Sequence, residues 1–204
     1  MDTLKYIANK FNVDTKKLII ELNDFGRNDL AKLFYELGFT KGTEIGVLLG
    51  RYSAVLCFYN KNLKLYSIDP FQEMKEYNDI KTQAQWDEFY KWTKKRIKPY
   101  NCELIREKSM DALKLFKDKS LDFVYIDGNH AFTSEANDIH GWGKKVRLGG
   151  IISGHDYIQY RYKSCSHSWE VVNAYIQAYR IRPLFIIGKN KDKIRSWFWV
   201  KTNG

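Results

Sequence analysis

Two pairs of acid and histidine residues in the second half of the chain have the side chains needed for proton transfer or cation binding. Asp127 and His130 stand three residues apart in YIDGNH, and His155 and Asp156 are adjacent in SGHDY. An imidazole can accept a proton near neutral pH, and two neighbouring carboxylates can bind Mg²⁺. We expect His130 or His155 to be a general base that acts beside Asp127. Asp127 and Asp156 are also candidate metal ligands, and a structural role in a loop is the alternative for His130.

A segment with two glycines, nearer the N-terminus, has features of a nucleotide-binding loop. In TEIGVLLGRYSAV, Gly46 and Gly50 follow a strand-like run and precede a helix that begins near Tyr52 and Ser53. Glycine lets the backbone approach a ligand closely, and the free N–H groups at a helix start can bind a carboxylate or phosphate. The Gly-x-x-x-Gly spacing differs from the Gly-x-Gly-x-x-Gly of nicotinamide-binding folds. Taken alone, this loop is a weak indication.

Two later segments have side chains that suit a nucleoside. Asp69 ends the strand-like run in LYSIDPF, about 20 residues past the glycines, where an acid can accept hydrogen bonds from ribose hydroxyls. Ser109 and Met110 follow a further strand and are suited to contact with an adenine ring. The alternatives are that Asp69 caps the turn before Pro70 and that Ser109 is only a helix N-cap.

Short β-rich runs alternate with helical patterns after residue 42, which is typical of βαβ units and a parallel sheet. We expect strands at 43–47, 63–68, 102–107, 121–126, 150–153, 183–187 and 196–201, and helices at 52–59, 84–98, 110–116, 134–146 and 169–179. The last two strands should form an antiparallel hairpin that closes one edge of the sheet. Before them all, LKYIANKF, DTKKLIIEL and NDLAKLFYELGF have helical patterns, with Asp14 and Asn28 as candidate N-caps.

The length of 204 residues fits one domain, with a helical extension at 1–39 and an α/β core at 41–204. The three cysteines, Cys57, Cys102 and Cys165, lack CxxC spacing, which favours a reducing, cytoplasmic location over disulfides or a zinc site. No apolar run approaches the roughly 20 residues that a helix needs to cross a bilayer, so no membrane partner is expected. The net charge of +10 favours anionic partners, including nucleic acid, although scattered solubilising lysines are the alternative.

From about residue 41 to residue 157, these motifs resemble the class I S-adenosylmethionine (SAM) methyltransferases. The resemblance is to the small-molecule O-methyltransferase branch, which includes the macrocin and catechol enzymes. It rests on the EIG and GRYSA segments of the glycine loop, on the acid of LYSIDPF, and most specifically on DGNH and GGIISGHDY. It implies a Rossmann-like, doubly wound sheet of seven strands in the order 3-2-1-4-5-7-6, with strand 7 antiparallel.

The resemblance also implies which residues bind SAM and whether a metal takes part. The implied SAM-binding residues are Glu44, Gly46, Gly50, Tyr52, Ser53, Asp69, Ser109, Met110, Asp127 and His130. Metal-dependent relatives hold Mg²⁺ on acids after the fourth and fifth strands, which here are Asp127 and Asp156. The next position, usually Asp or Asn, is Tyr157, a poor Mg²⁺ ligand. The resemblance therefore implies SAM and leaves Mg²⁺ an open alternative.

The expected reaction is transfer of a methyl group from SAM to a hydroxyl of a small polar acceptor. The acceptor should bind between the N-terminal region and the loop from Asp156 to Trp169, where Arg161, Lys163 and His167 suit an anionic molecule and the loop is long enough to be a lid. An ordinary surface loop is the alternative. A nucleic-acid methyltransferase or nucleic-acid-binding protein is the second interpretation, because WDEFYKWTKKRIKPY interleaves aromatic and basic residues. A non-catalytic SAM-fold protein and a nicotinamide-dependent oxidoreductase are further alternatives, and the oligomeric state stays open.

Overall fold

Strands β5 (Leu121–Ile126) and β8 (Ser196–Val200) are apolar on both faces, which is the pattern of strands covered by helices on either side. Phe123 and Phe198 pack into one hydrophobic core, whereas Val124 and Trp199 pack into a second core on the opposite face. Side chains alternate between the faces of a strand, so these two strands contribute to both cores at once. The sequence of these strands therefore requires a three-layer α/β architecture.

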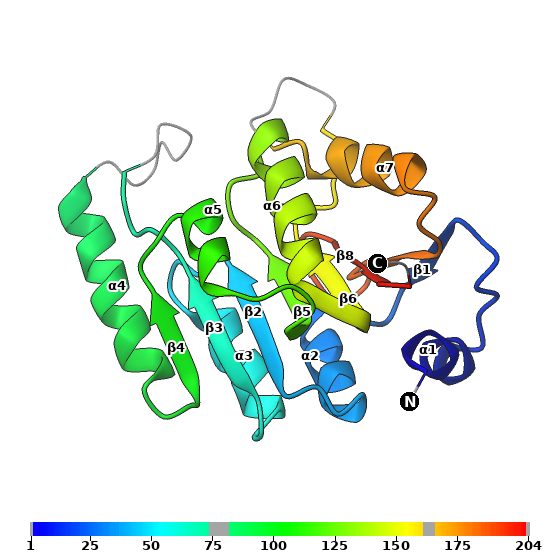
Figure 1. Ribbon diagram of the computed structural model, residues 1–204, viewed down its shortest axis with the longest axis horizontal. Coiled ribbons are helices and arrows are strands. Elements are labelled where there is room, and N and C mark those ends of the chain that lie inside the picture. Colours follow the sequence, from blue (N-terminus) through cyan, green and yellow to red (C-terminus); the bar gives the residue numbers. More distant parts are fainter. Residues whose placement is uncertain (1, 74–81, 161–165, 203–204) are drawn as a thin grey trace.

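The computed structural model describes residues 2–73, 82–160 and 166–202 (Figure 1). The helices in these ranges are α1 (Thr3–Phe11), α2 (Arg27–Glu36), α3 (Arg51–Tyr59), α4 (Gln83–Ile97), α5 (Ser109–Ala112), the short 3₁₀ helix η1 (Leu113–Leu115), α6 (Phe132–Lys145) and α7 (Ser168–Ala178). The remaining strands are β1 (Ile19–Leu22), β2 (Lys41–Ile45), β3 (Lys64–Ile68), β4 (Cys102–Ile105), β6 (Val146–Gly154) and β7 (Leu184–Ile187). No helix among the described residues is both long and apolar enough to cross a membrane.

The eight strands form one sheet in the order β1-β7-β8-β6-β5-β2-β3-β4. Read from β4, the first seven follow the expected order 3-2-1-4-5-7-6, and β8 is antiparallel to both of its neighbours, β6 and β7. The predicted α/β fold and the predicted hairpin are therefore confirmed. The expectation that the hairpin closes the edge of the sheet is wrong, because β1 pairs in parallel with β7 and lies outside it.

The prediction of a helix in DTKKLIIEL is wrong, because this segment contains β1. Ile20 and Leu22 are buried while the residues beside them are exposed, so the strand period of two replaces the helical period. Pairing with β7 supplies hydrogen bonds that a local propensity cannot anticipate. Neither expected N-cap holds. Asp14 accepts a hydrogen bond from the backbone N–H of Lys16 in a turn, and Asn28 lies inside α2, whose N-cap is Gly26.

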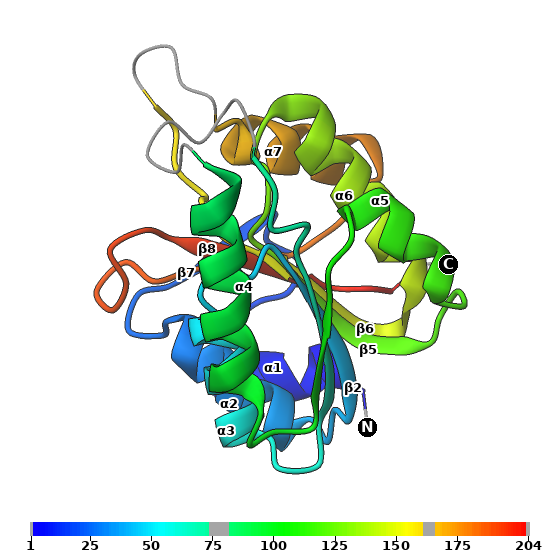
Figure 2. The same cartoon turned by 90° about the vertical axis from the view of Figure 1, so that its left-hand side faces the viewer.

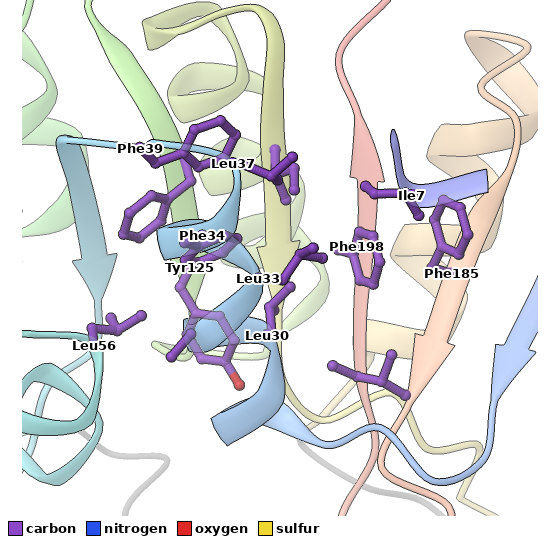
Figure 3. Close-up of a cluster of buried hydrophobic side chains, with 14 of the residues drawn as sticks. Ile7, Leu30, Leu33, Phe34, Leu37, Phe39, Leu56, Tyr125, Phe185 and Phe198 are labelled. Atoms are coloured by element: carbon purple, nitrogen blue, oxygen red, sulfur yellow. The ribbon is translucent and has the colours of Figure 1, made fainter. Parts of the chain in front are cut away.

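The helices cover the two faces of the sheet as separate layers. Helices α1 to α4 lie on one face and α5 to α7 on the other (Figure 2). Under the first layer, Ile7 of α1, Phe34 of α2 and Leu56 of α3 belong to one buried cluster with Tyr125 and Phe198 of the sheet (Figure 3). This burial holds the N-terminal helices firmly against the sheet that carries the site.

The sheet reverses its winding direction between β2 and β5, since the chain passes from β2 to β3 on one side and from β5 to β6 on the other. In open α/β sheets, ligands bind at such a reversal, outside the carboxyl ends of the strands. The backbone N–H of Asp127 donates to the carbonyl of Ile45 at 2.7 Å, which brings the loops after β5 and β2 into contact. The topology therefore places the glycine loop beside DGNH.

Candidate active site

A cavity of about 1150 Å³ opens at this reversal. The predicted site residues that line it are Glu44, Gly46, Tyr52, Asp69, Ser109, Met110, Asp127, His130 and Asp156. Three other predicted residues, Gly50, Ser53 and His155, are not among the described residues that line it. The fold thus gathers side chains that are up to 112 positions apart in the sequence, Glu44 to Asp156, into one ligand-sized space.

Glycine is required at position 46 by the close approach of two loops. Gly46 has a φ of +82°, and a Cβ atom there would lie 2.0 Å from the carbonyl oxygen of Asp127. Gly50 has a φ of +64° and is the N-cap of α3, whose first residue, Arg51, lies on the cavity wall. The two glycines therefore shape the backbone of the loop, and Gly46 also lines the cavity itself.

Glu44 forms a buried acidic group in the cavity wall. It is 1% exposed, and its carboxylate accepts a short hydrogen bond from the hydroxyl of Ser53, which lies 2.8 Å from the hydroxyl of Ser67. Burial raises the pKa of Glu44 well above its ordinary value, although the bond from Ser53 opposes this shift. Ser53, which was predicted to bind the cofactor, reaches the cavity only through Glu44.

Asp69 is held in place by backbone amides of the glycine loop and of the turn that follows Asp69 itself. One carboxylate oxygen accepts from Val47 N at 2.8 Å and from Leu48 N at 2.9 Å, and the other accepts from Phe71 N at 2.8 Å. Burial raises its pKa, while the three backbone bonds lower it. Asp69 therefore does cap the turn that follows it, as the alternative interpretation held, and it also lines the cavity with fixed oxygens.

Ser109 belongs to a polar group with Asp138 and Trp142 of α6. Its hydroxyl donates a short hydrogen bond to Asp138 and accepts from Trp142 Nε1 at 2.7 Å. Ser109 is the first residue of α5 and Lys108 is its N-cap, so the N-cap alternative for Ser109 is wrong. Burial raises the pKa of Asp138 to about 7. Asp138 was not predicted as a site residue. Its place on α6 points it toward the cavity only when the buried face of that helix is known.

The loops after β5 and β6 bring both acid and histidine pairs together. His130 Nε2 lies 3.2 Å from Asp156 Oδ2 and 3.5 Å from Asp127 Oδ1. His155 Nδ1 lies 3.1 Å from Asp156 Oδ1 and 3.5 Å from Asp127 Oδ1. Burial raises the pKa of Asp156, but His155 and His130 outweigh it and leave that pKa below its ordinary value. The two carboxylates are thus separated by imidazoles that offset their repulsion.

His130 is positioned from its other nitrogen by two buried partners. Its Nδ1 lies 3.1 Å from Glu135 Oε2 and 3.0 Å from the hydroxyl of Ser168. Burial alone would lower the pKa of His130, but Asp127 and Glu135 raise it to about 10. Glu135 is fully buried on α6 and was not predicted as a site residue. An acid in the first turn of the helix after DGNH could have indicated a partner for His130.

The expected third metal position does not face the cavity. Tyr157 is 6% exposed, packs in the second hydrophobic core, and its hydroxyl donates to Asn173 Oδ1 at 3.2 Å. Across 2–73, 82–160 and 166–202, no group of three or more His, Cys, Asp or Glu residues is arranged to hold a metal ion. The oxygens of Asp127 and Asp156 are instead next to imidazole nitrogens.

One side of the cavity is formed by segments outside the glycine loop and the two acid and histidine pairs. Arg27, from the start of α2, lines it and was not predicted; Tyr160 and Ser166 line it from the loop after β6. The backbone N–H of His167 donates to the carbonyl of His130 at 2.8 Å, which ties that loop to DGNH. Two of the three side chains expected to attract an anion, Arg161 and Lys163, lie outside the described residues.

Comparison with known proteins supports the assignment that the motifs suggest. Residues 43–157, more than half of the chain, match the methyltransferase-domain family. The uncharacterized protein R132 of Acanthamoeba polyphaga mimivirus is 26% identical over 141 residues, which are 69% of this chain and 57% of that protein. The chain therefore spans little more than half the length of this curated relative.

Solved structures share the fold over nearly the whole chain. The O-methyltransferase from Bacillus cereus, in complex with S-adenosylhomocysteine (SAH), has a TM-score of 0.62 at 14% identity and covers 98% of this chain and 91% of its own. The O-methyltransferase TomG from Streptomyces achromogenes, in complex with SAM, has a TM-score of 0.62 at 13% identity, with 98% and 90% covered. With the matched motifs, the strand order and the cavity at the sheet reversal, the chain belongs to the methyltransferase-domain family and has the class I SAM methyltransferase fold.

Proposed function

We propose that the protein is a SAM-dependent methyltransferase that transfers a methyl group to a hydroxyl of a small polar acceptor. The observation that carries the proposal is the position of His130, whose Nε2 faces the cavity between two carboxylates while Glu135 and Ser168 hold its Nδ1. A histidine fixed in this way is suited to take a proton from a hydroxyl.

The cavity walls fit SAM as the methyl donor. Gly46 lines the cavity with its backbone, and Asp69 presents oxygens fixed by three backbone amides. Asp69 would bind the ribose hydroxyls, while Ser109 and Met110 would contact the adenine. Bound SAM would supply a sulfonium methyl group, which an acceptor oxygen would attack in line, with the thioether SAH as the leaving group.

The chain's own residues would align the acceptor and remove its proton. As the acceptor oxygen forms its bond to the methyl carbon, the carbon–sulfur bond breaks and the hydroxyl proton passes to His130 Nε2. Asp127 and Asp156 stabilise the imidazolium that results, because both carboxylates lie within 3.5 Å of that nitrogen. His155 does not line the cavity, so we assign it a positioning role through Asp156 rather than the role of base.

The residues do not fit Mg²⁺. A divalent cation needs several oxygen ligands, yet Asp127 and Asp156 are paired with imidazoles and Tyr157 is bonded to Asn173. Removing divalent metals with EDTA is therefore expected to leave kcat within about twofold of its original value. Mg²⁺ at millimolar concentration should also leave the Tm unchanged in thermal unfolding. A loss of turnover in EDTA that Mg²⁺ restores would contradict this account.

The pH dependence of methyl transfer should report the ionisation of His130. Its pKa of about 10 means that it holds a proton at neutral pH, and a cation bound in the cavity would lower that pKa by repulsion. We expect kcat to rise with pH until His130 is deprotonated. Glu135→Gln removes a group that raises the pKa, so the rise should shift to lower pH. The check is kcat from pH 6 to 10 for the wild type, E135Q and the surface control Glu107→Gln; an unshifted E135Q profile would rule out this coupling.

The activity itself is tested with SAM labelled in its methyl group and a panel of small hydroxyl compounds, including anionic ones. Time-dependent transfer of the label, with formation of SAH, is the expected result. The size of the cavity and its charged and polar side chains support a small polar acceptor. Transfer to RNA or DNA in place of every small molecule would contradict the proposed substrate class.

A further inference from the structure

Arg27 places a positive charge on the cavity wall without a close acidic partner. Its side chain is 33% exposed, and its Nη1 lies 3.8 Å from Asp127 Oδ2, beyond hydrogen-bond distance, while the guanidinium also donates a hydrogen bond to the hydroxyl of Tyr125. A guanidinium has five N–H donors in a planar fork that matches a carboxylate. The donors that Tyr125 does not occupy can therefore bind a ligand in the cavity that Arg27 lines.

The backbone of Arg27 is fixed on both sides, which directs the side chain into the cavity. Its N–H donates to Asp192 Oδ2 at 2.8 Å, and its carbonyl accepts from the hydroxyl of Tyr52 at 2.8 Å. The guanidinium lies over the ring of Tyr52, 5.2 Å from its centroid. Such contacts remove conformational freedom before a ligand binds, which favours affinity. Tyr52 thus couples the glycine-loop helix to a residue outside the matched range of 43–157.

The wall that holds Arg27 also holds Glu44, so a guanidinium and a carboxyl group lie at one end of the cavity. Both residues line the cavity beside Gly46; burial raises the pKa of Glu44, and the charge of Arg27 opposes that rise. The methionine part of SAM carries an ammonium and a carboxylate on one carbon. Asp69 and Ser109, which suit the adenosine, lie farther along the strand ends, after β3 and β4.

We propose that Arg27 binds the methionine carboxylate of SAM while Glu44 faces the ammonium. This inference rests on the proposed function, because it assigns a further residue to the same donor site. The N-terminal segment, through α2, would then complete the donor site instead of contacting only the acceptor. Arg27 would discriminate SAM and SAH from nucleosides that lack the amino-acid group.

The test compares Arg27→Gln with the wild type by calorimetric titration of two ligands. SAH has the methionine carboxylate, whereas 5′-methylthioadenosine has the same thioether nucleoside without the amino acid. Arg27→Gln is expected to weaken SAH about 10- to 100-fold, the range for a charge-assisted bidentate contact, and to change 5′-methylthioadenosine by less than about twofold. Arg51→Gln tests the rival carboxylate partner, because Arg51 lines the same cavity from the first turn of α3, and Arg180→Gln, at an exposed residue outside the cavity lining, is the control that should leave both affinities unchanged.

Each other outcome overturns the inference. Equal weakening of both ligands in Arg27→Gln would show a structural role for the side chain, and unchanged affinity for SAH would show no role in binding. Loss of SAH affinity in Arg51→Gln but not in Arg27→Gln would show that Arg51, and not Arg27, binds the methionine carboxylate. If the wild type itself bound neither ligand, the proposed function would be wrong. The results for the variants test only the role of Arg27, so the two outcomes can be told apart.

Discussion

Replacing His130 with glutamine should lower kcat by about 10²- to 10⁴-fold, the range for loss of a general base. His130 lines the cavity, and its Nε2 is 3.2 Å from Asp156 Oδ2, so the variant removes the group that takes the acceptor proton. Affinity for SAH should fall much less, because the backbone of Gly46 and the carboxylate of Asp69 still line the cavity. Steady-state turnover and calorimetry with SAH measure the two effects separately.

The chain offers a matched control for this variant in His140. This histidine lies on α6, and its Nδ1 is 3.4 Å from the hydroxyl of Tyr175, away from the residues that line the cavity. His140→Gln should therefore keep wild-type turnover. Full turnover in His130→Gln, or an equal loss in both variants, would remove His130 from the role of base.

Replacing Gly46 with alanine should lower the free energy of unfolding by at least about 3 kcal/mol and abolish binding of SAM. The new Cβ would lie 2.0 Å from the carbonyl oxygen of Asp127, so the loops after β2 and β5 would have to separate. The positive φ of +82° adds the strain of a left-handed conformation. Chemical denaturation measures the stability, and titration with SAH measures what remains of the site.

Gly38→Ala is a control that separates the effect of the steric clash at Gly46 from the effect of a positive φ alone. Its φ of +69° is also positive, but a Cβ atom there would meet nothing within 4 Å. Gly38→Ala should cost only about 1 kcal/mol, the conformational effect alone, and should leave SAH binding unchanged. Equal losses of stability in the two variants would mean that loop contact at Gly46 is not what requires glycine.

The core strands could be predicted from the sequence because their local patterns agree with their tertiary environment. β5 and β8 are apolar except for Asp122 and Ser196 and lie in the interior of the sheet, and the polar turn between β7 and β8 indicated the antiparallel pairing of those two strands. β1 could not be predicted in the same way. Its four residues fit a helical stripe as well as a strand, and only the exposed edge of β7, far away in the sequence, selects the strand.

The site was predictable where side chains follow strand ends, since the carboxyl edge of a parallel sheet gathers them. Asp69, Asp127, His130 and Asp156 all line the cavity as the motifs indicated. The residues that the sequence missed act from elements whose buried faces depend on packing. Glu135 reaches His130 from the first turn of α6, and Arg27 and Asp138 come from helices that the loop motifs do not include.

The central claim is that the cavity at the sheet reversal is a SAM site, and calorimetric titration of the protein with SAM, SAH and NAD tests it most directly. We predict saturable binding of SAM and SAH, unchanged by EDTA, and no binding of NAD, because the Gly-x-x-x-Gly loop lacks the nicotinamide spacing. An Asp69→Ala variant should weaken SAM and SAH together. Failure of both SAM and SAH to bind the wild type, or binding of NAD in their place, would contradict the account.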